Sequence, residues 1–211
     1  MARPTEVTID IATSSQAIQN TDPLPNAQIP TVTLNGTQIP QPDGPTERYP
    51  SGVLVIVANS TGDLSDPANF ISSNLNIVWP DASANNYWYT TYRYMWDNVA
   101  NQIYGSGDPQ QQVVIAATYG MDAGMFPTPD VVELFLSLGA GPQLQKWINL
   151  PSPSESGDWV DYPIDYVLIG QPALGYGQAT EQLDYAGPGE GQAVKTNVSV
   201  TLQNSPEPPT A

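Results

Sequence analysis

The sequence predicts an α+β, β-rich single domain with a mixed β-sheet or sandwich and two packed helices. The chain of 211 residues has the length of one domain with a single core. Its 17 glycines and 22 prolines favour a turn-rich architecture. Two apolar runs, at 52–58 and 112–119, are typical of strands that are covered on both faces.

The N-terminal third shows strand and turn patterns. Residues 5–12 alternate polar and apolar side chains, which predicts a strand with Val7, Ile9 and Ile11 on one face. The run 31–34 meets Asn35-Gly36, a pair that favours a tight hairpin turn because both residues tolerate positive φ. Four prolines between 38 and 50 indicate an exposed connection.

Two helices and two further strands are predicted in the rest of the chain. Apolar residues recur with a helical period over 89–104, which predicts a helix between the two apolar runs. Those two strands can then be parallel neighbours joined by a crossover. A second helix is expected after Thr128 as N-cap, with Pro129 in its first turn and an end at Gly139. Further strands are expected at 166–170 and 194–202, and the proline-rich tail from Asn204 is expected to be mobile.

These elements divide the domain into three parts. Residues 1–50 form an N-terminal strand and a proline-rich arm, and residues 51–185 form the core. Residues 186–211 supply a C-terminal strand and the mobile tail.

Composition excludes several classes of protein. With 21 acidic and only five basic residues, the net charge is −16, so the chain should repel nucleic acid and anionic membranes. Without cysteine or histidine it has no disulfide framework, thiol nucleophile or zinc site. We therefore expect no cofactor, no metal and binding that survives chelation. No signal-peptide pattern or run of about 18 apolar residues is present. The sequence leaves the location open between a virion, an extracellular particle, the cytoplasm and export after removal of a leader.

Five features in order resemble one family. They are the run 52–57 with its turn at 60–63, the run 112–119 with an acidic loop at Asp122, the helix end 136–140, the strand 165–170 and the segment 178–182. Together they resemble the interleukin-like EMT inducer (ILEI/FAM3-like) lectin-like domain family over roughly residues 48–183. The resemblance implies that fold and a lectin-like binding role. Residues 71–88 and 150–161 look like insertions relative to the family.

Aromatic residues are the candidate ligand-binding groups, because a ring offers a large apolar area for stacking on a sugar or a protein partner. Tyr92 and Trp96, four apart on the predicted helix, are better explained by core packing. Trp79 and Trp88 are expected to be more exposed. The candidate site residues are Trp79, Tyr87, Trp88, Tyr89, Asp122, Trp159 and Tyr162.

The densest acidic window contains Glu155, Asp158, Asp161 and Asp165. Paired carboxylates next to aromatic rings suit glycoside hydrolysis, and oxygen ligands suit calcium, but a solvated loop beside an edge strand explains the window more simply. The leading hypothesis is a non-catalytic, lectin-like module that binds carbohydrate or a protein partner. The main alternative is a structural subunit that contacts other copies of itself in an assembly such as a virion. The third hypothesis is a carboxylate-dependent glycoside hydrolase.

Overall fold

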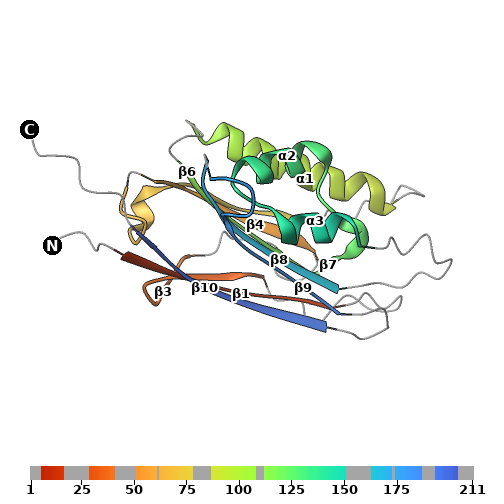
Figure 1. The fold of residues 1–211 in the computed structure, drawn as a ribbon, viewed down its shortest axis with the longest axis horizontal. Helices are drawn as coiled ribbons and strands as arrows, with labels where there is room; N and C mark the ends of the chain where they lie inside the picture. The colour runs from red at the N-terminus through yellow and green to blue at the C-terminus, as the bar shows by residue number, and fades with distance from the viewer. Residues whose placement is uncertain are drawn as a thin grey trace, which may run out of the picture.

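The protein folds into three layers (Figure 1). The computed structural model describes residues 6–16, 29–40, 51–60, 62–77, 87–107, 112–150, 163–172, 174–186 and 193–203, without the side chains of 67, 87–91, 122 and 123. Helices cover one face of a six-stranded antiparallel sheet, and a four-stranded antiparallel sheet covers the other face. The predicted α+β, β-rich single domain is confirmed, in its sandwich form.

The large sheet has the order β5-β4-β6-β8, with β9 on the far side of β8 and the short β7 also paired to β8. Its strands are β4 (Gly52–Asn59), β5 (Phe70–Ile77), β6 (Gln112–Tyr119), β7 (Met121–Asp122), β8 (Pro163–Gly170) and β9 (Thr180–Tyr185). The small sheet has the order β10-β1-β2-β3. Its strands are β1 (Glu6–Gln16), β2 (Thr31–Leu34), β3 (Thr37–Gln38) and β10 (Ala193–Gln203).

Strands from the two ends of the chain meet in the small sheet. Strand β1 pairs with β10 along its whole length, from Glu6 opposite Gln203 to Gln16 opposite Ala193. The hairpin predicted at Asn35-Gly36 joins β2 to β3, with φ values of 48° and 79°. The predicted exposed connection at 38–50 is wrong at its start, because Gln38 belongs to β3 and Ile39 is buried against the small sheet. Residues 41–50 and the tail from Asn204 lie outside the described residues.

The expectation that the first two apolar runs are parallel is wrong, because β4 and β6 are antiparallel neighbours. The cause is β5, which occupies residues 71–77 of the stretch 71–88 interpreted as an insertion. Strand β5 returns along β4, from Phe70 opposite Ala58 to Ile77 opposite Gly52. The helix α1 (Tyr87–Gly105) therefore leads the chain back to the end of β4, and β6 starts there in the opposite direction.

The two faces of the large sheet bury separate cores. In β4, Val53, Val55 and Val57 face the helices, whereas Leu54 and Ile56 face the small sheet. The helical core contains Trp96, Phe135, Trp147 and Tyr166 in edge-on and stacked ring contacts. The predicted core packing of Tyr92 and Trp96 is confirmed, since they are 6% and 0% exposed.

Helix α2 (Pro129–Ser137) begins and ends where the sequence predicts. Thr128 holds the N-cap position with an extended backbone, although its hydroxyl makes no capping hydrogen bond. Gly139 follows with a φ of 94°, a conformation that suits glycine after a helix. A third helix, α3 (Pro142–Ile148), is not predicted by the sequence.

The start of α3 is capped by a carboxylate from β9. Glu181 accepts hydrogen bonds from the backbone amides of Gly141 (2.9 Å), Gln143 (2.9 Å) and Leu144 (3.2 Å). It also accepts one from the Tyr166 hydroxyl (3.0 Å). Burial and the Glu181 charge together hold the pKa of Tyr166 well above its usual range, so its hydroxyl remains a donor. A negative charge at this position also stabilises the positive end of the helix.

Replacing Glu181 with Ala is expected to lower the free energy of unfolding by about 1–3 kcal/mol, because several donors lose a charged acceptor. Urea unfolding measures the loss. Glu133→Ala is the matched control, since Glu133 is exposed on α2, and it should change stability by less than about 0.5 kcal/mol. Equal stability of the two variants would show that the Glu181 cap contributes nothing.

Candidate functional site

None of the predicted site side chains is described by the structure. Trp79, Trp159 and Tyr162 lie outside the described residues. Tyr87, Trp88 and Tyr89 lie in the first turn of α1, and Asp122 lies in β7, but their side chains are likewise outside the description. The backbone of Tyr87 to Tyr89 and of Asp122 is described, as are Ile77, two residues before Trp79, and Pro163, directly after Tyr162.

The elements that carry or flank the candidates, namely the start of α1, the strand β7, the end of β5 and the start of β8, lie at one end of the sandwich, which we call the β7 end (Figure 1). Ile77, the last residue of β5, is opposite Gly52, which is in turn opposite Tyr119 at the end of β6. Asp122 is opposite Pro163, the residue that directly follows Tyr162.

Helix α1 begins at the same end. Its last turn lies at the other end of the sheet, where Ser106 Oγ is 3.1 Å from Ser72 Oγ. Nearer its start, Trp96 Nε1 donates to Met125 O, just after β7 (3.1 Å). The β7 end thus unites the start of α1, the strand β7, the end of β5 and the start of β8.

At this end the space between the two sheets becomes polar. The inward-facing residues of β1 change from Val7, Ile9 and Ile11 to Thr13 and Ser15. The Thr13 hydroxyl donates to Thr118 O, and the Ser15 hydroxyl contacts β8. We define the polar cluster by the residues Thr13, Ser15, Thr118, Asp165, Gln182, Asp184 and Thr196.

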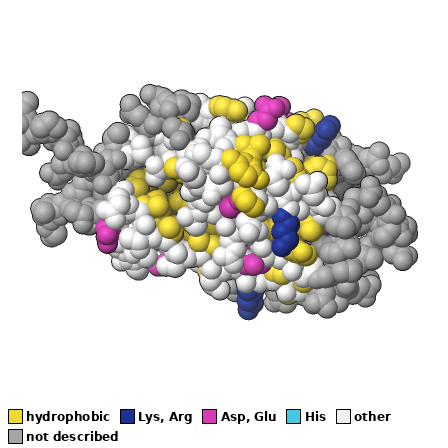
Figure 2. Space-filling model, in the orientation of Figure 1, with side chains coloured by type: hydrophobic (Ala, Val, Ile, Leu, Met, Phe, Trp, Pro, Cys, Tyr) yellow, Lys and Arg dark blue, Asp and Glu magenta, His cyan; other side chains and the backbone are white. Residues whose placement is uncertain are grey.

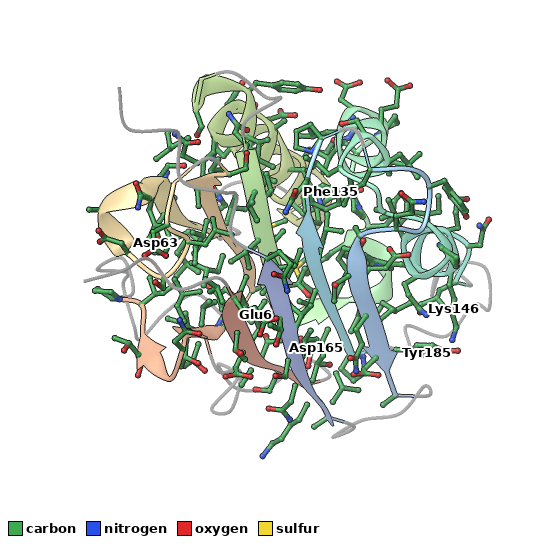
Figure 3. The ribbon with its side chains drawn as sticks, turned by 60° about the vertical axis from the view of Figure 1, so that its left-hand side comes forward. Glu6, Asp63, Phe135, Lys146, Asp165 and Tyr185 are labelled. Atoms are coloured by element: carbon green, nitrogen blue, oxygen red, sulfur yellow. The ribbon has the colours of Figure 1, made fainter. Side chains whose placement is uncertain are left out.

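Asp165 is the most deeply buried acidic group of the polar cluster. Its side chain is 0% exposed and lies inside the sandwich, whereas Lys146 and Tyr185 lie at the outside (Figure 3). Ser15 Oγ lies 2.5 Å from its Oδ1, and its Oδ2 has no hydrogen-bond partner among the described residues. Burial raises the pKa of Asp165 from 3.8 to about 7; the polar groups of Ser15 and Thr196 beside the carboxyl oppose this, and the negative charge of Asp184 adds to it.

Asp184 is the direct cross-strand neighbour of Asp165 and has different surroundings. Its Oδ2 accepts hydrogen bonds from Gln182 Nε2 (2.6 Å) and from Thr196 Oγ1 (2.7 Å). The Thr196 bond joins β10 of the small sheet to β9 of the large sheet. One oxygen of Asp184 therefore has two described donors, whereas Oδ2 of Asp165 has none.

The predicted solvated acidic loop is wrong for Asp165. Its strand, β8, is central in the large sheet and covered on both faces, so this carboxyl cannot reach a substrate in solvent. Glu155, Asp158 and Asp161 lie outside the described residues. Within the described part of the chain, no group of three or more acidic residues is placed to hold a metal ion. Among the described helices, none has the length and hydrophobicity to span a bilayer.

Sequence reasoning missed the polar cluster as a unit. One signal was available, namely an aspartate within the apolar run Ile164-Asp165-Tyr166-Val167, where a charge is unexpected. Its partners Ser15 and Thr196 come from opposite ends of the chain, and no local pattern links them.

The surface drawn in Figure 2 is mostly neutral, with scattered apolar side chains and few charges. On α1, Tyr94 and Tyr104 are 64% and 57% exposed, the highest values among its described aromatic residues. Their rings lie on the outer side of the helix, away from the buried Trp96 and Val99.

Comparison with known proteins adds no relative. No protein-family model matches the chain, and no curated protein matches it significantly. The ILEI/FAM3-like resemblance stays a prediction.

Proposed function

We propose that this protein is a non-catalytic, lectin-like module that binds carbohydrate or a protein partner at the β7 end. The observation that supports the proposal is the convergence there of backbone positions that carry or flank the aromatic candidates. Ile77 precedes Trp79 by two residues, Tyr87 to Tyr89 begin α1, and Pro163 follows Tyr162. Segments far apart in the sequence are thus attached next to one another on a rigid sheet, as in many binding sites.

The chemistry of this end suits a neutral ligand. In the chain as a whole only 12% of the residues are charged. The aromatic segment at Tyr87 to Tyr89 follows the amides Asn85 and Asn86 in sequence. Rings can stack on a sugar or a peptide surface, and amides can bond to hydroxyls. The one acidic residue of the predicted hydrolase window that the structure describes, Asp165, is buried away from solvent.

Replacing Trp79 or Trp88 with Ala is expected to weaken binding by about 1–3 kcal/mol, because an interface anchor is lost. A glycan array and a pull-down with candidate proteins would first identify the ligand, and calorimetry would then compare the variants. The matched control is Tyr104→Ala, since Tyr104 is an exposed ring at the other end of α1 and should leave affinity unchanged.

The melting temperature of each variant must be measured on the same samples. If Trp79→Ala and Trp88→Ala lower stability but bind normally when folded, the rings belong to the core and the binding site is elsewhere. Equal losses of affinity in Trp88→Ala and Tyr104→Ala, with normal binding by Trp79→Ala, would place the ligand along α1 instead.

A structural subunit of a larger assembly is the second candidate, and one observation favours it. Among the described strands, β5 pairs only with β4, so its outer edge is open, and Ile71 on this strand is 45% exposed. An open edge with an exposed apolar side chain can pair with another subunit. Light scattering separates the candidates: a high-order assembly supports the structural role, whereas a monomer with a glycan ligand supports the binding module.

A further inference from the structure

The hydroxyl of Ser15 has one hydrogen and three close polar neighbours. Its Oγ lies 2.5 Å from Asp165 Oδ1 and 2.7 Å from Ile164 O, and it accepts a hydrogen bond from the Met121 amide at 3.2 Å. A serine hydroxyl can donate once and accept twice. The two short contacts to oxygen therefore cannot both use the serine hydrogen.

The protonation state of Asp165 decides how these contacts are satisfied. If Asp165 is a carboxylate, Ser15 must donate to it or to Ile164 O, and one short oxygen-to-oxygen contact lacks a hydrogen. If Asp165 is a carboxylic acid, Oδ1–H donates to Ser15 Oγ and Ser15 donates to Ile164 O. The protonated form supplies a hydrogen for each contact and uses the full capacity of the hydroxyl.

The other carboxyl oxygen leads to the same assignment. Oδ2 of Asp165 is buried and has no hydrogen-bond partner among the described residues. An unpaired oxygen costs much less on a neutral acid than on a buried carboxylate. The negative charge of the neighbouring Asp184, whose Oδ2 accepts two hydrogen bonds, disfavours a second charge beside it.

No described cation faces Asp165 from the elements around it. The described groups beside it are Asp184 of β9, Ser15 of β1 and Thr196 of β10. Lys195 is exposed and alternates to the outer face of β10. Thr118 of β6 and Met121 of β7 are uncharged and hydrogen-bond to Tyr166 and Ser15, the neighbours of Asp165. On β8 itself Tyr166 points to the helical core.

We propose that Asp165 is a buried proton-binding site that latches the two sheets together at the β7 end. The protonated acid joins β8 to β1 through Ser15. Loss of the proton removes one hydrogen from this chain of bonds and puts a second negative charge beside Asp184. The sheets then open more readily at this end as pH rises, whichever ligand the protein binds.

The test measures the proton and the opening separately in the whole chain. The carboxyl carbon of Asp165, followed by NMR in the wild-type protein, should titrate near pH 7. Hydrogen exchange, corrected for the intrinsic rate, should show protection of 6–16, 163–170 and 193–203 falling by up to about tenfold per pH unit between pH 4 and 7. Peptides from α2 serve as the internal control and should not follow this trend.

The variant Asp165→Asn should remove the pH dependence of exchange, because its amide can donate to Ser15 at every pH. A carboxyl titration near pH 4, or the same pH profile of hydrogen exchange in both proteins, would overturn the proposal. Exchange is repeated at pH 8 with calcium or magnesium chloride. If these cations restore protection in the wild type but not in Asp165→Asn, the site binds a cation and not a proton, which also overturns the proposal. The NMR titration needs no variant and decides the question if Asp165→Asn does not fold.

Discussion

Relative to Asp165→Asn, the wild-type protein is expected to lose about 4 kcal/mol of unfolding free energy as the pH rises from 4 to 8. The pKa of Asp165 rises from 3.8 in the unfolded chain to about 7 in the folded protein. Below pH 4 both states bind the proton, so this group causes no loss. Between pH 4 and 7 only the folded state binds it, and stability falls by about 1.4 kcal/mol per pH unit. Above pH 7 both states are ionised, and the full cost of the buried charge is present.

Urea unfolding of both proteins at each pH from 4 to 8 measures this difference. The comparison with Asp165→Asn is essential because the net charge of −16 makes self-repulsion grow with pH in any variant. That general effect is nearly the same in the two proteins and cancels. Parallel stability profiles would show that Asp165 ionises normally in the folded state.

A second variant checks the cause of the raised pKa. Asp184→Asn removes the neighbouring negative charge, which is one of the contributions that raise the pKa of Asp165. The pH window of the stability loss should therefore move to lower pH, although burial, the largest cause, keeps it above the usual range. No movement would assign the shift to burial alone.

Much of the fold could be predicted because its strongest signals are local. The runs that became β4 and β6 are buried on both faces, so nearly every residue is apolar. Asn35-Gly36 forms the hairpin turn because both residues adopt positive φ. The apolar residues of α1 recur with a helical period because one side of the helix is buried against the sheet, where Met95, Trp96 and Val99 are fully buried.

The elements that sequence reasoning missed depend on distant partners. Strand β5 is an edge strand with mostly half-exposed side chains, so its sequence has no apolar run, and missing it reversed the expected direction of β6. Helix α3 has seven residues, and its cap, Glu181, is about 40 positions away in sequence. The burial of Asp165 likewise requires Ser15, 150 residues earlier. Such long-range contacts leave no periodic pattern.

Ile56 and Ile115 are direct cross-strand partners on β4 and β6 of the large sheet, and both are buried in the core that faces the small sheet. Replacing either with Ala is expected to lower the free energy of unfolding by about 2–5 kcal/mol, because the deleted methyl groups leave a cavity between sheets that cannot close. The matched control is Ile71→Ala on β5, which is 45% exposed and should cost less than about 1 kcal/mol. Since the two residues are neighbours, the double variant should differ from the sum of the single losses by at least about 0.5 kcal/mol. Losses below about 1 kcal/mol at both sites, measured by urea unfolding, would mean that the small sheet does not seal this core and that helical packing alone holds the domain together.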